Sequence, residues 1–506
     1  MTGADFPDSL RDARCYPHAV AKIELCETHI SWVLLTGEYA YKIKKPVKLS
    51  FLDFSTLAAR KHFCEEELRL NRRFAPELYL GVVPITGDAQ SPTIGGRGPV
   101  LDYAVKLKQF RRENELENLV AANQISLEQI IRFGESLAAV HATLPTVSGV
   151  SPDTFRRVVA DNTSELLALR PQERSRIAGL RERLQLMHDR NRTLLDDRYG
   201  SEAIRECHGD LHLGNVVRID EELKAFDCIE FDAALRNIDV LNDAGFLFMD
   251  LEAHDRRDLA YCFLNAWLQS NGDYLALPLL PYYVCYRALV RAKVAALQRQ
   301  ESAMARYLPE ATRRSQDRAP RLILTCGLSG SGKTWLSKQL LTRLPAIHIR
   351  SDIERKRLAG IGAAESSRSL VGGGIYTPEF NTRTYQRLLD CARAGLNAGE
   401  TVIVDAAFLR REERAAFSEL ADKTNASFAI LHCFAPSGVL QERIQERSRH
   451  GQDASEATTE VLARQYDYWE PFTASEKAAV LEIDTRVDSP QSIVERLRLF
   501  QSALSK

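Results

Sequence analysis

The later part of the chain alternates short apolar runs with longer stretches in which apolar residues recur at helical spacing. The apolar runs lie at residues 322–326, 346–350, 401–404, 428–434 and 479–483. Each run has the length of a single strand, and its apolar residues follow one another, which is typical of strands buried on both faces. Because these runs alternate with helical stretches, the pattern predicts a parallel sheet covered by helices on both faces.

The earlier part of the chain opens with strands instead. Residues 31–36 and 39–44 flank Gly37-Glu38, a Gly-X pair suited to a two-residue β-hairpin. Successive side chains of a strand point to opposite faces, so we expect Lys42 and Lys44 on one face and apolar side chains on the other.

A helix is predicted after these strands, with an N-cap at Ser55 or Thr56 and an end near Arg72. Beyond Ser126 the pattern is mostly helical, apart from a strand-rich segment at residues 204–231. Strands and helices are therefore expected in separate regions here, unlike the alternation in the later part of the chain.

A polar segment that ends in proline separates the two parts. Residues 311–320 read ATRRSQDRAP and precede the apolar run at 322–326. Such a segment is typical of an interdomain linker. We therefore predict one domain over residues 1–312, a linker over 313–320 and a second domain over 321–506, each large enough for its own core.

Composition narrows the possible classes of protein. The chain has 506 residues with 67 Lys and Arg against 68 Asp and Glu, a formal charge of −1. This balance argues against coating of nucleic acid by bulk charge, although a local basic groove remains compatible with it. No apolar run approaches the roughly 18 residues of a membrane span, and the N-terminus lacks the apolar core of a secretory signal. The ten cysteines include no C-x-x-C pair, which favours reduced thiols and a cytoplasmic location. Neither a membrane partner nor an oligomeric state is indicated.

The segment 327–334, GLSGSGKT, fits the phosphate-binding pattern G-x-x-x-x-G-K-[ST]. Glycines let backbone N–H groups converge on phosphate oxygens, the lysine reaches the β- and γ-phosphates, and the hydroxyl binds Mg²⁺. A predicted strand before the motif and a helical stretch after it favour this interpretation over a glycine-rich turn with a surface lysine. We therefore expect ATP and Mg²⁺ as cofactors here, held by Gly327, Gly330, Ser331, Gly332, Lys333 and Thr334.

Two carboxylates follow strands of the same predicted sheet. Asp352 comes directly after the run at 346–350, at the carboxyl edge where ligands bind. It can accept the proton of an attacking hydroxyl, and it can also cap a helix together with Ser351. Asp405 ends the run at 401–404, where a carboxylate can orient the Mg²⁺ shell.

Two arginines lie one helical turn apart, at Arg443 and Arg447. They can close over the phosphates and neutralise charge in the transition state. They can equally belong to a solvated helix face, paired with Glu442 and Glu446.

These motifs resemble those of the P-loop kinases, in particular the group that includes phage-type polynucleotide 5′-kinases and zeta-type toxin kinases. In that family an Asp-x-x-Arg pair follows the second strand, and here it reads Asp352-Ile-Glu-Arg355. The resemblance implies that Asp352 is the general base, that Arg355 holds the acceptor side, and that Arg443 and Arg447 belong to the lid. Residues 360–380 match no substrate signature, so the acceptor stays open.

A second chemical motif lies in the strand-rich segment of the earlier part. Residues 208–215 read HGDLHLGN. Asp210 can accept a hydroxyl proton, Asn215 can hold a metal, and Asp227, after a predicted hairpin, can hold it from the other side. The spacing parallels the H-R-D-x-x-x-x-N loop of protein kinases with its later D-F-G aspartate.

An alternative for this segment is a polar turn with a zinc-binding pair, His208 and His212. No further His or Cys lies at ligand spacing, although Cys207 is adjacent. Phosphate transfer is therefore the favoured interpretation.

The segment closely resembles the aminoglycoside phosphotransferase and choline kinase superfamily, marked by H-G-D-x-x-x-x-N and a later strand-ending Asp. The similarity spans about residues 20–300. It implies an α+β two-lobed kinase-like domain with ATP between the lobes. It also implies Asp210 as base and Asn215 and Asp227 as Mg²⁺ ligands, with Asp232 as a reserve ligand.

This fold also requires a lysine on a strand of the first lobe, paired with a glutamate on a helix. The pattern does not separate Lys42 from Lys44, and we choose Lys42. On the helix, Glu67 shares a face with apolar residues and is the better inward-facing partner than Glu65. The alternative is a basic strand edge beside an acidic helix face. By order along the chain, residues 102–105 are expected to form the hinge that touches adenine.

We therefore expect an α+β two-lobed kinase-like domain followed by an α/β P-loop domain, with two ATP·Mg²⁺ sites. The first is expected to phosphorylate a small-molecule hydroxyl, and the second to act as a P-loop kinase. One alternative is a nucleotide or nucleic-acid 5′-hydroxyl kinase in the second domain, which predicts a basic channel near Arg355, Arg383 and Arg387. Another is that one domain only binds ATP and regulates the other.

Overall fold

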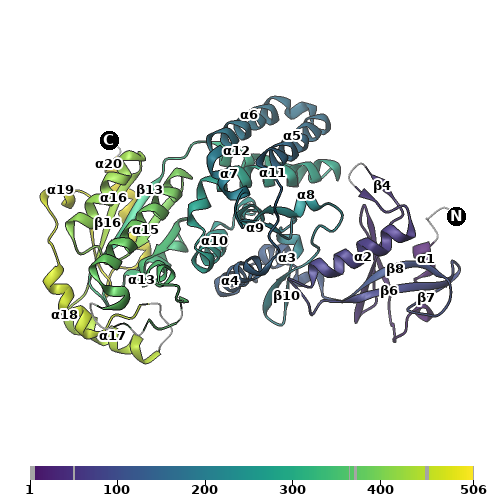
Figure 1. Cartoon of the computed structure of the whole chain (residues 1–506), viewed down its shortest axis with the longest axis horizontal. Helices are drawn as coiled ribbons and strands as arrows, with labels where there is room; N and C mark the ends of the chain where they lie inside the picture. Colours follow the sequence, from purple (N-terminus) through teal and green to yellow (C-terminus); the bar gives the residue numbers. More distant parts are fainter. Residues whose placement is uncertain are drawn as a thin grey trace. The chain divides into compact units, whose positions relative to one another are not determined.

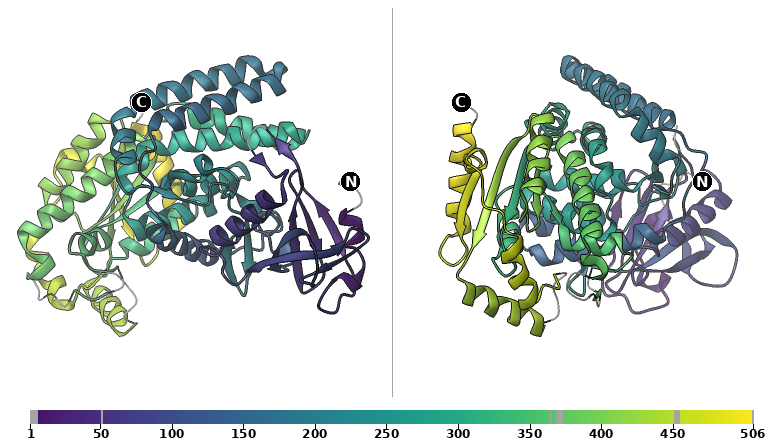
Figure 2. Two further views of the ribbon diagram at one scale, coloured as in Figure 1. Left: turned by 45° about the vertical axis from the view of Figure 1, so that its right-hand side comes forward. Right: turned by 60° about the vertical axis from the view of Figure 1, so that its left-hand side comes forward.

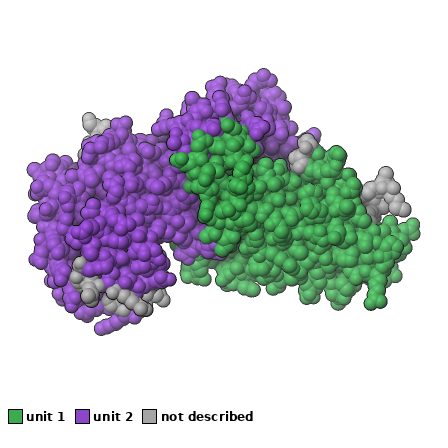
Figure 3. Space-filling view, in the orientation of Figure 1, with its two compact units in different colours: residues 1–133, 140–154, 196–250 green, residues 134–139, 155–195, 251–506 purple. Residues whose placement is uncertain are grey.

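The computed structural model describes the chain in two compact units, shown in different colours in Figure 3. The described residues are 6–49, 52–363, 365–367, 369, 373–450 and 455–504, without the side chains of 6, 448, 450 and 500–504. Unit 1 comprises residues 1–133, 140–154 and 196–250, and unit 2 comprises 134–139, 155–195 and 251–506.

Unit 1 contains an antiparallel six-stranded sheet (Figure 1). In spatial order its strands are β1 (Glu24–Glu27), β2 (Ser31–Leu35), β3 (Tyr39–Lys44), β8 (Val100–Lys108), β6 (Tyr79–Asp88) and β7 (Ser91–Ile94). Strands β2 and β3 form the hairpin predicted around Gly37-Glu38.

Strand β3 divides its side chains between two faces, as predicted. Tyr41 and Ile43 are buried in a core with Trp32 and Leu34. The opposite face packs against helix α2 (Leu57–Asn71). Lys42 and Lys44 therefore point toward the helix that carries Glu67.

Helix α2 begins where the sequence indicated. Of the two proposed N-caps, Thr56 takes the position, and its hydroxyl accepts the N–H of Ala59 at 3.1 Å. Such a cap satisfies one of the unpaired N–H groups at the start of a helix.

The strand-rich segment of unit 1 consists of short pairs rather than a large sheet. Strand β10 (Val216–Ile219) pairs with β11 (Glu222–Ala225), and β9 (Ile204–Glu206) pairs with β12 (Asn237–Asp239). Both residues of the β10–β11 turn, Asp220 and Glu221, have positive φ angles of 46° and 67°, as a type I′ hairpin requires. The segment leads into helix α9 (Val240–Ala253).

Unit 2 contains the predicted parallel sheet, with five strands. In spatial order they are β14 (Ile347–Arg350), β15 (Thr401–Asp405), β13 (Arg321–Cys326), β16 (Ser427–Phe434) and β17 (Val480–Asp484). All four neighbouring pairs are parallel. The five apolar runs of the sequence correspond to these strands.

Helices cover both faces of this sheet, as the two views of Figure 2 show. On one face, α13 (Lys333–Leu341) and α20 (Pro490–Leu504) pack on Ile323 and Ile403. On the other, α15 (Pro378–Asn397) and α16 (Arg411–Lys423) lie against the strands, with Gly395 close to Val402. The predicted α/β layering is therefore confirmed.

Several helices that precede the parallel sheet in the sequence belong to the same compact unit. They include α10 (Arg257–Asn271), the 3₁₀ segment η5 (Tyr274–Leu279) and α12 (Glu301–Ser315). Helix α12 ends at Ser315 and β13 begins at Arg321, so the predicted linker 313–320 contains the end of that helix.

The remaining long helices are amphipathic or buried, in keeping with the helical pattern after Ser126. Their bounds are α4 (Leu127–Thr143), α5 (Pro152–Leu169), α6 (Arg174–Arg190), α11 (Leu280–Leu297), α14 (Ser351–Leu358), α17 (Ser437–His450) and α18 (Thr459–Tyr468). Within the described part of the chain, none of the helices combines the length and the apolar character needed to cross a lipid bilayer.

Candidate functional sites

The first candidate site is built around two lysines that share one glutamate. The Lys42 ammonium lies 2.9 Å from Glu67 Oε1 and forms a second ion pair with Asp227. Lys44 pairs with the other oxygen of Glu67 and with Glu230. The predicted strand lysine, helix glutamate and metal-binding aspartate are thus brought together.

Exposure separates the two lysines, which the sequence could not do. The side chain of Lys42 is 14% exposed and that of its partner Asp227 is 41% exposed. Lys44 and Glu67 are fully buried. Lys42 is therefore the more accessible of the two lysines, and Lys44 pairs with Glu67 within the protein.

The charges of this cluster keep Glu67 ionised. Burial alone raises the pKa of a carboxyl group, but Lys42 and Lys44 together lower the pKa of Glu67 to about 2. The Glu67 carboxylate can therefore hold both ammonium groups at neutral pH.

The loop at residues 208–215 places the proposed base beside a proposed metal ligand. The Asn215 side-chain amide donates to the backbone oxygen of Asp210 at 2.9 Å and to its carboxylate at 3.1 Å. The N–H of Asp210 lies 3.3 Å from His208 Nδ1, and His208 Nε2 lies 2.9 Å from the carbonyl oxygen of Phe226. With Nδ1 accepting and Nε2 donating, one ring nitrogen serves the loop and the other binds Phe226, which follows β11. This arrangement does not favour the zinc alternative.

A buried aspartate on α9 anchors the same loop. Asp243 accepts the backbone N–H groups of His208 at 3.1 Å and Gly209 at 2.9 Å. The ring of His141 lies 3.1 Å from the Asp243 carboxylate. His141, Asp243 and Cys207 offer three metal-type ligand atoms within 4.8 Å of one another, yet the Asp243 carboxylate already serves these hydrogen bonds. The link between Asp243 and this loop exists only in three dimensions, so no local motif identifies it.

Backbone conformation explains two residue choices near this site. Gly209 has a φ of 85°, and a Cβ there would come within 2.9 Å of the Leu235 carbonyl oxygen. A side chain at this position would therefore displace the loop. Asp227 has a φ of 65°, and its N–H donates to the hydroxyl of Tyr79 at 3.1 Å. That hydrogen bond helps to hold the unusual backbone conformation beside the carboxylate.

Two other expectations for the first domain concern the adenine hinge and the reserve metal ligand. The expected adenine hinge at residues 102–105 is wrong as a connection between lobes, because this segment lies inside β8. Ala104 and Val105 pair with both β3 and β6, and Asp102 and Tyr103 pair with β6. The backbone groups of this segment are therefore engaged in the sheet, and Asp102 also pairs with Arg60. The reserve ligand Asp232 accepts the N–H of Ala234 at 2.8 Å at the start of a short helix.

The second candidate site begins at the loop between β13 and α13. Gly327 has a φ of 139°, and a Cβ there would lie 2.2 Å from the carbonyl oxygen of Cys433. Lys333 at the start of α13 donates to the carbonyl oxygens of Gly327 and Leu328, both at 2.9 Å. Burial lowers the pKa of Lys333. The loop thus has the form that a phosphate cradle requires.

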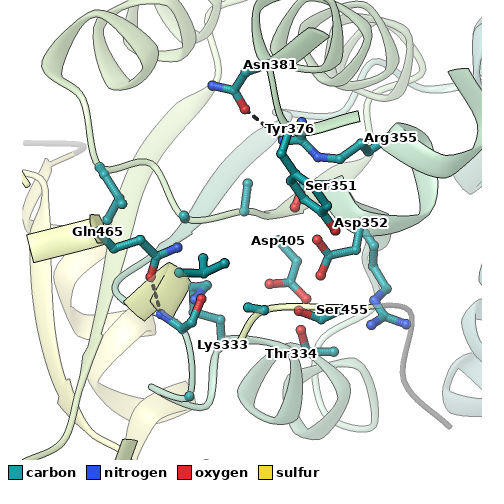
Figure 4. Close-up of a pocket in the computed structure, with 18 of the residues that line it drawn as sticks. Lys333, Thr334, Ser351, Asp352, Arg355, Tyr376, Asn381, Asp405, Ser455 and Gln465 are labelled. Atoms are coloured by element: carbon teal, nitrogen blue, oxygen red, sulfur yellow. Dashed lines mark hydrogen bonds between the residues drawn. The ribbon is translucent and has the colours of Figure 1, made fainter. Parts of the chain in front are cut away.

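The predicted carboxylates lie beside this loop. Figure 4 shows the carboxyl groups of Asp352 and Asp405 facing the same space as Thr334. Asp405 accepts the Thr325 hydroxyl at 3.2 Å, and its second oxygen lies 3.5 Å from Nε2 of His348. Burial acts to raise the pKa of Asp405, but His348 and other neighbours lower it to about 2. Asp405 is therefore ionised at neutral pH.

A cavity of about 560 Å³ joins these groups. Its walls include nine of the predicted residues: Gly330, Gly332, Lys333, Thr334, Asp352, Arg355, Asp405, Arg443 and Arg447. Gly327 and the buried Ser331 belong to the loop but do not line the cavity.

The predicted arginines are held at the cavity wall by backbone and side-chain acceptors. Arg355 donates to the carbonyl oxygen of Ile375 at 2.9 Å and to the side chain of Asn381 at 2.8 Å. Arg443 donates to the Thr485 hydroxyl at 2.8 Å, and Arg447 donates to the carbonyl oxygen of Ala457 at 2.9 Å. The alternative of a glutamate-paired surface for Arg443 and Arg447 is not observed among the described side chains.

The predicted basic channel near Arg355, Arg383 and Arg387 is not formed by the described residues. Arg387 pairs with Glu354 at 2.9 Å and donates to the carbonyl oxygen of Gly272 at 2.6 Å. Arg383 stacks over the ring of Phe380, and neither arginine is part of the cavity wall. Asn381 and Tyr385 of α15 line the cavity, whereas Arg383 and Arg387 lie on another face of this helix and contact other residues.

Sequence reasoning missed several groups of the cavity wall. These are Arg350 at the end of β14, Tyr376, Asn381 and Tyr385 before or within α15, and Gln465 on α18. The Gln465 side chain accepts the N–H of Ser329 at 2.7 Å, as Figure 4 shows. Only Arg350 carried a usable signal, because it directly precedes the predicted Ser351-Asp352. Of the unmatched segment 360–380, residues 364, 368 and 370–372 lie outside the described residues.

Similarity to known proteins extends over the whole chain. An uncharacterized protein of Mycobacterium tuberculosis (strain ATCC 25618 / H37Rv), Rv2004c, is 30% identical over 508 residues. The match covers 97% of this chain and 99% of that protein. The chain belongs to the same family as this mycobacterial protein. The two-part arrangement is therefore not peculiar to one sequence.

Parts of the chain match more widely known proteins. Residues 322–472 match the family described as AAA domain. Among solved structures, a gluconokinase from Sinorhizobium meliloti 1021 is 20% identical with a TM-score of 0.27, covering 37% of this chain and 94% of its own. A choline kinase from Cryptosporidium parvum Iowa II is 10% identical with a TM-score of 0.39, covering 58% of this chain and 88% of its own. The solved structures similar to this chain thus include kinases, among them a choline kinase, the type that the motifs of the earlier part resemble.

Proposed function

We propose that the chain is an ATP-dependent phosphotransferase with two ATP·Mg²⁺ sites, each of which transfers phosphate to a hydroxyl group. One observation carries this proposal: each half brings a lysine, metal-type oxygen ligands and a candidate base carboxylate into one place. In the first half Lys42 pairs with Asp227 and Asn215 contacts Asp210, and the N–H of Phe226, next to Asp227, donates to the backbone oxygen of Asn215. In the second half these groups are Lys333, Thr334, Asp405 and Asp352.

The donor sets fit magnesium. Mg²⁺ prefers carboxylate, amide and hydroxyl oxygens and rarely takes an all-protein cage. Asp227 is partly exposed, and Asp405, although buried, lines the cavity beside Thr334. Both carboxylates can therefore turn an oxygen toward a bound cation. When bound, Mg²⁺ would neutralise charge on the β- and γ-phosphates.

In the first half, the chain's own groups divide the work of phosphate transfer. Asp210 accepts the proton of the acceptor hydroxyl, and the Asn215 amide holds the Asp210 carboxylate in place. Lys42 supplies positive charge to the phosphates while Glu67 fixes its ammonium. Asp243 holds the backbone of this loop in place by accepting the N–H of Gly209.

In the second half, Asp352 takes the role of the base at the start of α14. The backbone of the loop 327–334 and Lys333 bind the phosphates. Arg443 and Arg447 neutralise charge that develops during transfer. Arg355 orients the acceptor side through its position in the cavity wall.

The test uses the full chain and an acceptor screen with ATP consumption as the readout. Amino sugars, choline-like amines, nucleosides and 5′-hydroxyl oligonucleotides are compared for the wild type, Asp210→Asn and Asp352→Asn. Each variant should lose turnover of a different acceptor set by about 1000-fold, since a general base and its orientation contribute on that order. The partly exposed Asp390→Asn is a matched control that should keep both activities. If either base variant keeps full turnover of every acceptor, that assignment fails.

A second candidate for the later half is a kinase of nucleotide or nucleic-acid 5′-hydroxyl groups. It is favoured by Arg350, Arg355 and Arg410, which give the cavity wall positive charge beyond the loop itself. It is opposed by the absence of Arg383 and Arg387 from that wall. Labelling of a 5′-hydroxyl oligonucleotide that Asp352→Asn abolishes would establish it, and no labelling would remove it.

Regulation of one half by the other is the remaining alternative. It predicts that one base variant leaves all turnover intact while nucleotide binding to the corresponding half persists. The same acceptor screen, combined with calorimetric ATP binding, separates this outcome from two active sites.

A further inference from the structure

A histidine of the outer strand of the parallel sheet lies between the second site and helix α10. His348 is on β14, the strand at one edge of the sheet, and it is 1% exposed. Asn265 of α10 donates to the carbonyl oxygen of Ala346 and accepts the N–H of His348, both at 2.8 Å. The hydroxyl of Tyr274 donates to the carbonyl oxygen of His348 at 3.0 Å. Residues before the predicted linker therefore fix the backbone of this histidine.

The two ring nitrogens of His348 face different partners. Nδ1 lies 3.4 Å from the side-chain Nε2 of Gln269, also on α10. An amide nitrogen can only donate, so Nδ1 accepts and the ring proton is on Nε2. Nε2 in turn lies 3.5 Å from Asp405 Oδ2. The ring thus presents an N–H group to the carboxylate.

The Asp405 carboxylate has a hydrogen bond on one side and the His348 ring nitrogen, just beyond hydrogen-bond distance, on the other. The Thr325 hydroxyl contacts Oδ1 at 3.2 Å, and the His348 ring faces Oδ2. Groups that hydrogen-bond a metal-binding carboxylate fix its orientation and tune its affinity for the metal. Asp405 itself lines the cavity beside Lys333 and Thr334.

We propose that His348 is a positioning residue of the second site, through which Gln269 and Asn265 of α10 orient Asp405 toward the magnesium of bound ATP. Helix α10 is then a working part of the P-loop site, although it precedes the linker in the sequence. This inference rests on the proposed ATP·Mg²⁺ function of the second site.

The experiment measures ATP binding to the full chain by calorimetry, with Mg²⁺ and with EDTA, in an Asp227→Ala background that weakens the first site. His348→Gln and His348→Asn form a matched pair, because the longer glutamine amide reaches the place of Nε2 and the asparagine amide reaches only that of Nδ1. Mg²⁺ is expected to tighten ATP binding in the parent chain. His348→Asn should reduce this Mg²⁺-dependent tightening about tenfold, and His348→Gln should retain most of it. Binding in EDTA should stay unchanged, because Lys333 and the loop amides hold the phosphates.

Two further variants sharpen the test. Gln269→Leu removes the donor to Nδ1 and should reduce the Mg²⁺-dependent tightening about threefold, since it acts at one remove. His432→Asn is the control, because His432 lies on β16 and pairs with Glu482 at 2.7 Å, outside the cavity wall. It should leave both affinities unchanged.

A readout that needs neither metal nor nucleotide comes from the metal-free chain labelled with ¹⁵N-histidine. The Nε2–H form of His348 should be observed, and Gln269→Leu should increase the Nδ1–H form. Observation of the Nδ1–H form in the wild type would overturn the proposed geometry.

The outcomes distinguish this inference from the proposed function. If the Asp227→Ala chain binds ATP with Mg²⁺-dependent tightening and His348→Asn leaves that tightening intact, the positioning role is wrong. A parallel loss of affinity in Mg²⁺ and in EDTA would also overturn it, because that pattern indicates damage to the fold. If the Asp227→Ala chain binds no ATP while Lys333 is intact, the proposed function of the second site fails, and this inference falls with it.

Discussion

In the first site the lysines pair with the carboxylates around them, whereas in the second the loop lysine contacts backbone oxygens. Lys42 is bound to Glu67 and Asp227, and Lys44 to Glu67 and Glu230. Lys333 instead donates to the carbonyl groups of its own loop. In the first site, phosphate and metal must therefore compete with existing ion pairs, whereas in the second they replace weaker neutral contacts.

The two sites also differ in the source of their support. The groups that hold the first site lie within unit 1 and within the predicted first domain. The sheet that carries the second site, together with Glu400 directly before β15, is hydrogen-bonded by Asn265, Tyr274 and Arg314. These residues lie before or at the predicted boundary, yet they belong to unit 2 together with the parallel sheet. A boundary read from composition therefore does not mark where the packing of the second site ends.

The largest expected effect is on a fragment that begins at the predicted boundary. Glu400 is buried and pairs with Arg314 at 2.7 Å, with Tyr261 at 2.5 Å and with Arg318. A fragment of residues 321–506 lacks all three partners and also loses the cover of β14. Breaking a buried ion pair costs about 3–5 kcal/mol, so its free energy of unfolding should fall by at least that amount.

The measurement is thermal unfolding of fragments 321–506 and 251–506. The longer fragment restores α10, η5 and α12 and should unfold at a temperature higher by about 10 °C or more. Equal stability of the two fragments would mean that the second domain is complete without these helices.

Lys44→Met should produce the next largest effect, on stability. Its removal leaves Glu67 with one partner fewer and Glu230 buried without its ion pair. We expect a loss of about 3–5 kcal/mol in the free energy of unfolding, measured by urea denaturation. Adding Glu230→Gln should restore part of it, because the uncompensated charge is removed. If Lys44→Met has the same urea midpoint as the wild type, Lys44 does not stabilise the fold through Glu67 and Glu230.

Lys42→Met should affect the first site rather than the fold. Glu67 keeps Lys44, so stability should change little, but the charge that faces the phosphates is lost. We expect kcat/KM at the first site to fall about 100-fold, typical of removing one charged group at a transferring phosphate. Lys45→Met is a matched control, since Lys45 pairs with the exposed Glu27. A stability loss as large as that of Lys44→Met would reverse the roles of the two lysines.

Acid should weaken unit 2 through Glu400. Burial acts to raise the pKa of Glu400, but Arg318 and Arg314 lower it to about 2. A lowered folded pKa gives stability that is present above the ordinary value near 4.3 and is lost as the pH falls toward 2. Between these values the wild type should lose about 1.4 kcal/mol per pH unit more than Glu400→Gln. Parallel pH profiles of the two proteins would show that this ion pair is not formed.

Thr325→Val should have the smallest effect. It removes the hydroxyl that contacts Asp405 while keeping a similar shape. A single hydrogen bond contributes about 0.5–1.5 kcal/mol, so the tightening of ATP binding by Mg²⁺ should fall about threefold to tenfold. Ser337→Ala on α13, a buried hydroxyl away from the cavity wall, is the control. An equal response of both variants would mean that Thr325 does not act through Asp405.

Motifs with fixed local spacing allowed much of this architecture to be predicted. The loop 327–334, the strand-ending Asp405 and the group Asp210, Asn215 and Asp227 are each defined by neighbours in the sequence. The continuous apolar runs likewise identified all five strands of the parallel sheet, because strands that are buried on both faces are apolar along their whole length.

Contacts between distant segments could not be predicted in the same way. Lys42 and Lys44 share a strand face, and only their burial beneath α2 and the segment around Glu230 separates them. The error at residues 102–105 arose because order along the chain does not show that β8 is an inner strand. Asp243, His348 and Gln465 have no local signature, since each acts through hydrogen bonds to segments far away in the sequence.

The hydrogen bonds that α10 and η5 make to the edge strand β14 also affect the tendency of this protein to aggregate. An outer strand with unpaired N–H and C=O groups is a template on which a strand of another molecule can add. Asn265 and Tyr274 already satisfy the carbonyl group of Ala346 and both backbone groups of His348. Opening of α10 would expose that template, so heat or truncation that loosens this helix should lead to edge-to-edge aggregation before the sheet itself melts.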